Sequence, residues 1–206
     1  MKELMEKMFP YIPLFVTSLA KCLTGPKTFV RGAITKDEAL KQSLIFFGMS
    51  VAMTFILNFP ARKPGEDFWP TLGNLGALML AIAVIWGLAI YLSWKMVGGK
   101  AEFDSTLTIH LYYLGTFFPV FSMYMFASDG MQIASKSVAA SVPLDVLAFF
   151  CMVSWIIVSW GAYRELNGLT RLRSAIAGIA CFLMVIPGWK VVEAIGAWLR
   201  STRVDL

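Results

Sequence analysis

The sequence contains a single histidine, which is the first candidate for chemistry. His110 lies in the run GGKAEFDSTLTIHLYYLGTFFP, a few residues inside a strongly apolar stretch. An ionisable side chain within a membrane span is costly, so it usually faces protein or a water-filled cavity. Because an imidazole titrates near neutral pH, His110 could relay protons. No carboxylate lies clearly inside a neighbouring span to pair with it. A neutral histidine, hydrogen-bonded to Ser, Thr, Tyr or backbone, is therefore the favoured interpretation.

A second pair of ionisable residues lies near the carboxyl end. Lys190 and Glu193 are three residues apart on a predicted helix, so they can form an ion pair on a shared face. They follow Pro187-Gly188, where we expect a kink or a break. The pair could line a cavity open to the outside. An interfacial ion pair with Trp189 and Trp198 as belt residues is the favoured interpretation.

The sequence patterns of common catalytic sites are missing. Intramembrane proteases need paired aspartates or a serine with a histidine, metalloproteases need HExxH, and GGKAE lacks the spacing of a phosphate-binding loop. Cys22, Cys151 and Cys181 form no CxxC pair, which favours apolar packing over disulfides or metal ligands. We therefore expect no enzyme, no catalytic residues, no cofactor and no metal site.

The composition indicates the environment of these side chains. Of the 206 residues, 58% are hydrophobic and 15% are charged, and the mean hydropathy is +0.68. A soluble globular domain of this size would not tolerate that balance, so we predict a membrane protein. Five stretches reach the roughly 20 apolar residues that cross a bilayer core. They lie at about 40–59, 72–94, 106–127, 144–163 and 174–198.

The predicted fold is an all-α, polytopic membrane helical bundle of five transmembrane helices preceded by an amphipathic interfacial helix. Residues 1–35 would form a cytoplasmic or interfacial segment, and residues 36–206 a single five-span membrane domain. With the amino terminus in the cytoplasm, twelve basic residues lie on the cytoplasmic side and six on the other. Because basic residues near span ends stay in the cytoplasm, we expect this orientation, with the carboxyl terminus outside. The net charge of +5 then reflects topology and attraction to anionic lipid, and nothing suggests nucleic acid.

The segment before the first span has an amphipathic pattern. Apolar residues recur there at helical spacing: Phe15, Val16, Leu19, Cys22 and Leu23. Gly25-Pro26 ends the run, so we predict a short helix in the cytoplasmic interface. Phe15, Leu19 and Leu23 are candidates for docking a cytoplasmic partner. A helix that anchors the chain to the lipid bilayer is the favoured alternative.

Small residues occur in two of the predicted spans. The start of the second span has small side chains at Gly73, Gly76 and Ala77. The fifth span contains a small-xxx-small pair, Ser174 and Gly178. Both features let helix backbones approach closely. Close packing within one chain and a homo-oligomer both explain them, and the sequence leaves these alternatives open.

Three motifs, taken in order, are similar to the Yip (Ypt-interacting protein) family of five-span membrane proteins, including its bacterial relatives. They are TGPKTFVRG followed by DEALKQSLIFF, VGGKAEFDSTLTIHLYYLGTFFP, and YRELNGLTRLRSAIAGI. The family's aromatic-then-proline stretch is matched by Tyr112, Tyr113, Phe117, Phe118 and Pro119. The resemblance implies a helical membrane domain with a cytoplasmic amino terminus. It also implies an association with Rab-type small GTPases and trafficking, and no established enzymatic role.

The chain departs from the eukaryotic members of that family in two ways. It lacks their long Pro- and Gln-rich cytoplasmic tail, and it has no Asp-Leu-Tyr-Gly-Pro motif before the first span. These departures weaken the expectation of GTPase binding. They favour a short prokaryotic member in a bacterial cytoplasmic membrane.

Two functions from different classes are compatible with these features. The first is a membrane scaffold or adaptor in trafficking or envelope organisation, which binds a cytoplasmic or membrane protein through residues 1–41 and the cytoplasmic turns. The second is a small oligomeric channel or transporter for ions or small solutes, with a cavity near His110, Pro119 and Pro187. The proline residues favour the second because broken helices often line transport sites. The scarcity of charge within the spans disfavours it.

Overall fold

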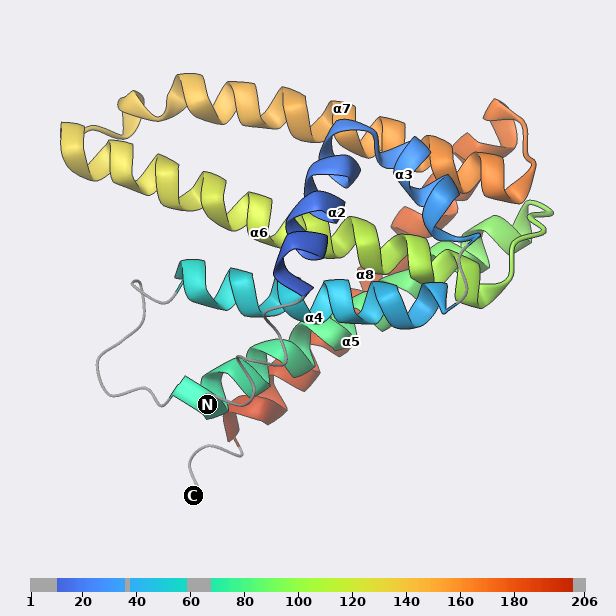
Figure 1. The fold of residues 1–206 in the computed structure, drawn as a ribbon, viewed down its shortest axis with the longest axis horizontal. Coiled ribbons are helices and arrows are strands. Elements are labelled where there is room, and N and C mark those ends of the chain that lie inside the picture. Colours follow the sequence, from blue (N-terminus) through green and yellow to red (C-terminus); the bar gives the residue numbers. More distant parts are fainter. Residues whose placement is uncertain (1–10, 36–37, 59–67, 202–206) are drawn as a thin grey trace.

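The computed structural model describes residues 11–35, 38–58 and 68–201, and the regular structure in these ranges is entirely helical (Figure 1). The α-helices are α2 (Ile12–Thr24), α3 (Pro26–Ala33), α4 (Ala39–Asn58), α5 (Phe68–Met96), α6 (Phe103–Ser135), α7 (Val142–Asn167) and α8 (Arg171–Ser201). A short 3-10 helix, η3 (Val138–Ala140), connects α6 to α7. The all-α prediction is confirmed for this part of the chain. Residues 1–10, the start of the predicted interfacial segment, lie outside it.

Each predicted span coincides with one long helix. Four of these helices, α4, α5, α7 and α8, are long and apolar enough to cross a membrane. The remaining one, α6, is the longest at 33 residues, but its polar side chains keep it out of this group. The membrane character of the chain therefore rests on four helices.

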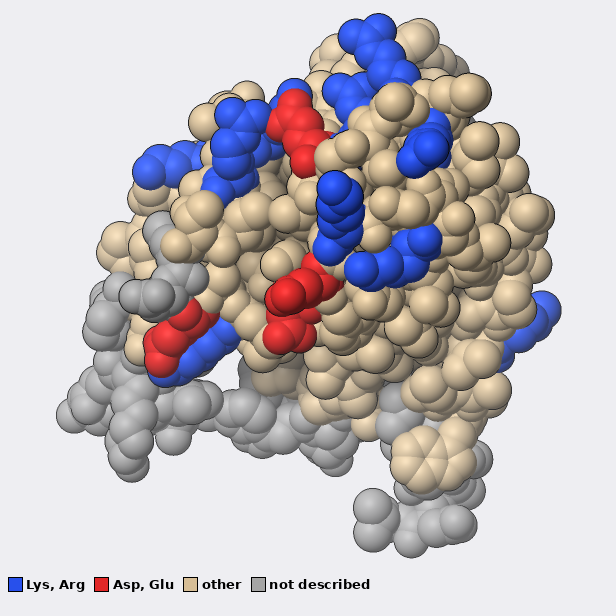
Figure 2. Space-filling model, turned by 90° about the vertical axis from the view of Figure 1, so that its right-hand side faces the viewer, with Lys and Arg blue, Asp and Glu red and all other residues tan. Residues whose placement is uncertain are grey.

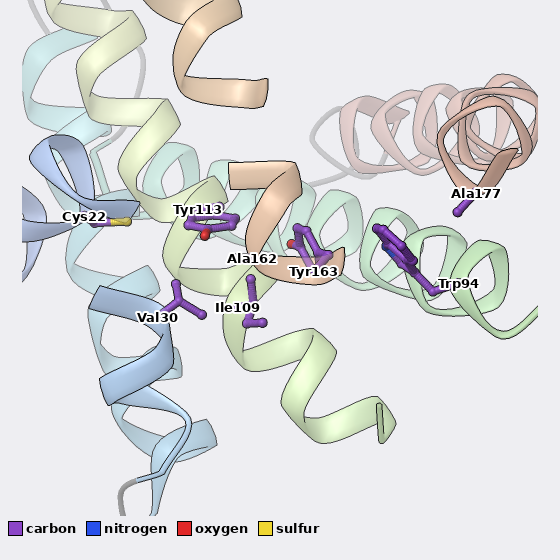
Figure 3. Close-up of a cluster of buried hydrophobic side chains, with 8 residues drawn as sticks. All are labelled: Cys22, Val30, Trp94, Ile109, Tyr113, Ala162, Tyr163 and Ala177. Atoms are coloured by element: carbon purple, nitrogen blue, oxygen red, sulfur yellow. The ribbon is translucent and has the colours of Figure 1, made fainter. Parts of the chain in front are cut away.

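Helix α6 lies in the middle of the bundle. From Thr106 to Thr116 its side chains are buried or nearly so, because α4, α5 and α7 all pack against it. Helices α5 and α8 run side by side, and the α6–α7 hairpin diverges from them (Figure 1). Figure 3 shows one core cluster, to which Tyr113 and Ile109 of α6, Tyr163 of α7 and Trp94 of α5 contribute.

Two turns meet at one end of the bundle. The α5–α6 turn contains Gly98 at φ +90°, and α7 ends at Gly168 at φ +64°, a left-handed conformation that glycine adopts without strain. Asn167 joins the two turns: its amide nitrogen donates to the carbonyl of Tyr163, and its side-chain oxygen accepts the N–H of Ala101 at 3.2 Å. Because Asn167 is buried, these bonds fix the position of α7 against the turn.

The prolines within two long helices do not interrupt them. Helix α6 continues through Pro119 and α8 continues through Pro187. Of the expected kink or break at Pro187-Gly188, the break is therefore not present, and the kink stays a prediction. Helix continuity removes the broken-helix geometry that favoured a transport site.

Gly76 of the second predicted span and Gly178 of the fifth pack within the chain, whereas Gly73 and Ala77 are exposed. A Cβ added at Gly178 would lie 3.6 Å from the indole of Trp160, whose nitrogen donates to the carbonyl of Ser174 at 3.2 Å. A Cβ added at Gly76 would lie 3.8 Å from Val51 of α4. Gly76 and Gly178 therefore fit the intramolecular explanation, and the homo-oligomer stays a prediction for Gly73 and Ala77.

Candidate functional site

The amino-terminal helices α2 and α3 cross the bundle instead of continuing it (Figure 1). Helix α2 ends at Thr24 as its spacing predicts, and its apolar face buries Phe15 and Cys22. The next helix, α3, was not predicted; it begins at Pro26, whose fixed φ suits a first helical position. Gly25 separates the two helices and sets the angle between them.

A chain of aromatic rings fastens α2 and α3 to α4 and α6. The ring of Phe15 lies 5.1 Å from that of Phe46, and Phe46 lies 5.1 Å from Tyr112, measured between centroids. Phe29 of α3 meets Tyr112 edge-on at 5.0 Å. These distances fall within the range in which aromatic pairs attract beyond their area burial. The four rings therefore form a continuous floor beneath the amino-terminal helices.

Two hydrogen bonds hold the bend between α2 and α3. The indole nitrogen of Trp155 donates to the carbonyl of Cys22 at 3.2 Å, and the hydroxyl of Tyr113 donates to the carbonyl of Pro26 at 3.3 Å. Cys22 itself is fully buried, and this burial raises the pKa of its thiol to about 12. Cys22 therefore acts as a packing residue and not as a thiolate. Figure 3 shows Cys22 and Val30 beside Tyr113 and Ile109.

Ion pairs tie α3 to the end of α7. The carboxylate of Glu165 pairs with Lys27 and accepts a hydrogen bond from Arg31 at 2.6 Å. All three side chains are at least partly exposed, so the pairs contribute little to stability. These ion pairs instead hold α3 at the end of the bundle where the α7–α8 turn lies.

That end of the bundle is strongly basic. Figure 2 shows Lys and Arg gathered there with few acidic side chains between them. The described basic residues of this end are Lys27, Arg31, Lys41, Lys95, Lys100, Arg164, Arg171 and Arg173, and the acidic ones are Glu38, Glu102, Asp104 and Glu165. This asymmetry is typical of the cytoplasmic end of a membrane protein.

A groove of about 560 Å³ opens between α2, α3 and α4; we call it the amino-terminal groove. Its floor is apolar and is formed by Phe15, Phe29, Phe46, Met49 and Tyr112. Its rim is polar and includes Thr17, Ser18, Lys21, Thr24, Thr28 and Gln42. A cavity of this size with an apolar floor and a few polar groups is typical of a binding site.

The predicted docking residues take three different positions. Phe15 is 7% exposed and belongs to the floor of the amino-terminal groove. Leu19 is half-buried against the same aromatic rings. Leu23 is exposed and lines a separate cavity between α6 and α7. The three residues therefore do not form one outward-facing surface.

The residues Tyr112, Tyr113 and Pro119 of α6, singled out in the sequence, take different positions. Tyr112 contributes to the groove floor, and Tyr113 holds the bend through its hydroxyl. Pro119 is fully buried further along α6. The sequence did not single out Phe29 or Phe46, since both lie in other segments and no local pattern indicates that they face Tyr112.

The two candidates for proton or ion chemistry lie away from this groove. His110 is 5% exposed and packs against Gly87 of α5, and its Nε2 has no hydrogen-bond partner among the described residues. Lys190 and Glu193 form the predicted ion pair at 2.8 Å on an exposed face of α8. These three residues line neither the amino-terminal groove nor the cavity that Leu23 lines.

The described residues contain no group of three or more His, Cys, Asp or Glu side chains that could hold a metal ion. The amino-terminal groove presents hydroxyls, an amide, one ammonium group and aromatic rings. Such groups can bind and orient a partner by packing and hydrogen bonding. No family model, curated protein or solved structure matches the chain.

Proposed function

We propose that this chain is a non-enzymatic integral membrane protein that acts as a scaffold or adaptor, in protein or vesicle trafficking or in envelope organisation. In this proposal the amino-terminal groove receives an apolar segment of a cytoplasmic or membrane protein partner. The observation that carries the proposal is the groove itself, with an aromatic floor and a polar rim beside the basic end of the bundle.

The proposal includes five membrane spans: the four apolar helices α4, α5, α7 and α8, and in addition α6. The α5–α6 turn and the α6–α7 connection lie at opposite ends of the bundle in Figure 1, so α6 must join the two ends. Its 33 residues extend about 50 Å at roughly 1.5 Å per residue, which exceeds a bilayer core of about 30 Å. Length and connectivity thus support a crossing even though α6 is less apolar than its neighbours.

The basic end supports the proposed orientation of the chain. We assign this end to the cytoplasm, which puts the amino terminus inside and the carboxyl terminus outside. A bacterial cytoplasmic membrane is the proposed location. The exposed apolar side chains of α2, Ile12 and Val16, would then contact lipid, so that α2 serves both as an anchor and as one wall of the groove.

The charge of the site indicates the chemistry of the partner. Lys21 is exposed at the rim of the groove, and the surrounding end of the bundle carries excess positive charge. A segment with apolar anchors and flanking acidic residues would complement both features. The resemblance to the Yip family supports a role in protein association, and the missing eukaryotic motif argues against a Rab-type GTPase as the partner.

The test uses a groove-filling variant and a matched control. Gly32 lines the groove, and a Cβ added there would meet nothing within 4 Å, so Gly32→Phe fills the groove without a clash near the backbone. Gly48 has the same open surroundings on an exposed face of α4 outside the groove, so Gly48→Phe is the control. Each protein is extracted in native lipid, and its complex is analysed by mass spectrometry.

We expect a stoichiometric partner with wild type and Gly48→Phe, and its loss with Gly32→Phe and Lys21→Glu. If all variants retain the partner, the amino-terminal groove is not the binding site. A homo-oligomer without a partner would instead favour the alternative, a small channel or transporter, and flux in liposomes would be measured next.

A further inference from the structure

A second cavity, which the proposed function does not use, lies between α6 and α7. It measures about 490 Å³, and we call it the α6–α7 cavity. Its lining is dominated by the rings of Phe117, Phe121, Phe149 and Trp155, and Leu23 of α2 closes one side. Because this lining is mostly apolar, the cavity can accept the apolar part of a lipid molecule.

One carboxylate lies at the wall of this cavity. Asp145 is half-buried, and its Oδ1 accepts hydrogen bonds from the hydroxyls of Tyr124 at 2.8 Å and Ser128 at 3.1 Å. Its Oδ2 accepts a bond from the hydroxyl of Ser141 at 3.0 Å. Two carboxylate oxygens offer about four acceptor positions, so one remains for a ligand.

The surroundings of Asp145 leave its negative charge without a cation. The three donors are neutral hydroxyls, and no ion pair to Asp145 forms within the described residues. Two other carboxylates do have a basic partner: Glu165 pairs with two basic residues of α3, and Glu193 pairs with Lys190. A carboxylate held by neutral donors beside aromatic rings is complementary to an ammonium group.

The separation of the lining residues along α7 indicates the kind of molecule that carries this ammonium group. Trp155 follows Asp145 by ten residues on the same helix, a distance of about 15 Å at roughly 1.5 Å per residue. That distance is half of a hydrocarbon core of about 30 Å, or one leaflet. Asp145 lies within the first turns of α7, at the end of the bundle opposite the basic end, where a lipid headgroup would reside.

We propose that the α6–α7 cavity binds an aminophospholipid of the leaflet opposite the basic end. The primary ammonium group donates a hydrogen bond to the carboxylate of Asp145, with the ring of Tyr124 beside it. One acyl chain extends along Phe149 to Trp155 and ends near Leu23. This site is independent of the amino-terminal groove and adds a defined lipid to the partners of the protein.

The experiment measures lipid retention by the full chain. The purified protein is equilibrated with mixed vesicles containing equal amounts of phosphatidylethanolamine and phosphatidylglycerol with identical acyl chains, and the bound lipid is quantified by native mass spectrometry. We expect wild type to retain the ethanolamine lipid at least several-fold over the glycerol lipid. Asp145→Asn should abolish that preference. Glu193→Gln removes a carboxylate that already has a basic partner on the same helix, so it should leave the preference unchanged.

A second variant tests the acyl-chain part of the site. Ala148 lines the cavity one turn beyond Asp145, so Ala148→Trp fills it and should reduce retention of both lipids, with Ala134→Trp on an exposed face of α6 as the control. Equal retention of both lipids by wild type would overturn the proposal, as would an unchanged preference in Asp145→Asn. Binding of a small lipophilic amine without any retained phospholipid would also overturn it. Only variants that are monodisperse by size-exclusion chromatography and helical by circular dichroism are compared with wild type.

Discussion

The hydroxyl of Tyr113 provides the sharpest test of how the amino-terminal helices are held. Tyr113→Phe keeps the ring against Trp155 and removes the bond to the carbonyl of Pro26. The O···O distance of 3.3 Å is long for a hydroxyl donor, so we take the lower half of the usual net value, about 0.5–1 kcal/mol. That corresponds to a two- to fivefold rise, roughly, in the equilibrium for local opening of α2 and α3.

The assay is amide hydrogen exchange of α2 and α3 in a lipid nanodisc, in the regime where exchange reports the opening equilibrium. Tyr163→Phe is the matched control. Tyr163 is another buried tyrosine in contact with Tyr113, but its hydroxyl has no hydrogen-bond partner within the described structure. Removing that hydroxyl should leave exchange unchanged or slow it slightly. Equal acceleration by both variants, or none by Tyr113→Phe, would refute the role assigned to this bond.

Three further predictions concern the rest of the bundle. Gly99→Ala should lower the free energy of unfolding by roughly 1–3 kcal/mol, because the new Cβ would overlap the side-chain oxygen of Asn167 and would lie 2.7 Å from the carbonyl oxygen of Trp94; Gly130→Ala, with open space, should leave it unchanged. His110→Leu should leave thermal stability unchanged or raise it, since the imidazole Nε2 is buried without a hydrogen-bond partner among the described residues. A marked loss of stability would contradict this and would show that Nε2 has a hydrogen-bond partner. Glu165→Gln should cost less than about 1 kcal/mol, and the difference from wild type should shrink at 1 M salt; a salt-independent loss would contradict an exposed ion pair.

Much of the helical layout could be predicted from the sequence, because the length of an apolar run determines where a spanning helix can lie. The predicted span 144–163 lies inside Val142–Asn167, and the helix extends beyond it at both ends. Helices continue past the hydrocarbon core until a residue such as Gly168 ends them, so hydropathy marks the centre of a helix better than its boundaries. The pairing of Lys190 with Glu193 was also predictable, since it depends only on helical spacing.

The candidate sites were less predictable because they depend on contacts between distant segments. The spacing of Phe15 and Cys22 predicted one apolar face on α2, but not whether lipid or protein would cover it. The covering residue Tyr112 lies ninety positions away from Cys22. In the same way, the sequence showed Asp145 near a helix start, but not the hydroxyls of Tyr124 and Ser128 that surround it.

The hydropathy of α6 follows from its place in the bundle. The side chains that make it less apolar include Thr106, Thr108, His110, Thr116 and Ser122, and each of them is at most 8% exposed. Neighbouring helices, and not lipid, therefore cover the polar groups of α6. Helix α7 shows the opposite case: only 6% of its most apolar window is buried, so its apolar side chains are available to lipid. A polar side chain is costly only where it faces lipid. A helix in the centre of a bundle can therefore carry polar side chains that a helix at its periphery cannot. The low hydropathy of α6 is therefore compatible with the proposed fifth crossing, because its neighbours cover its polar side chains.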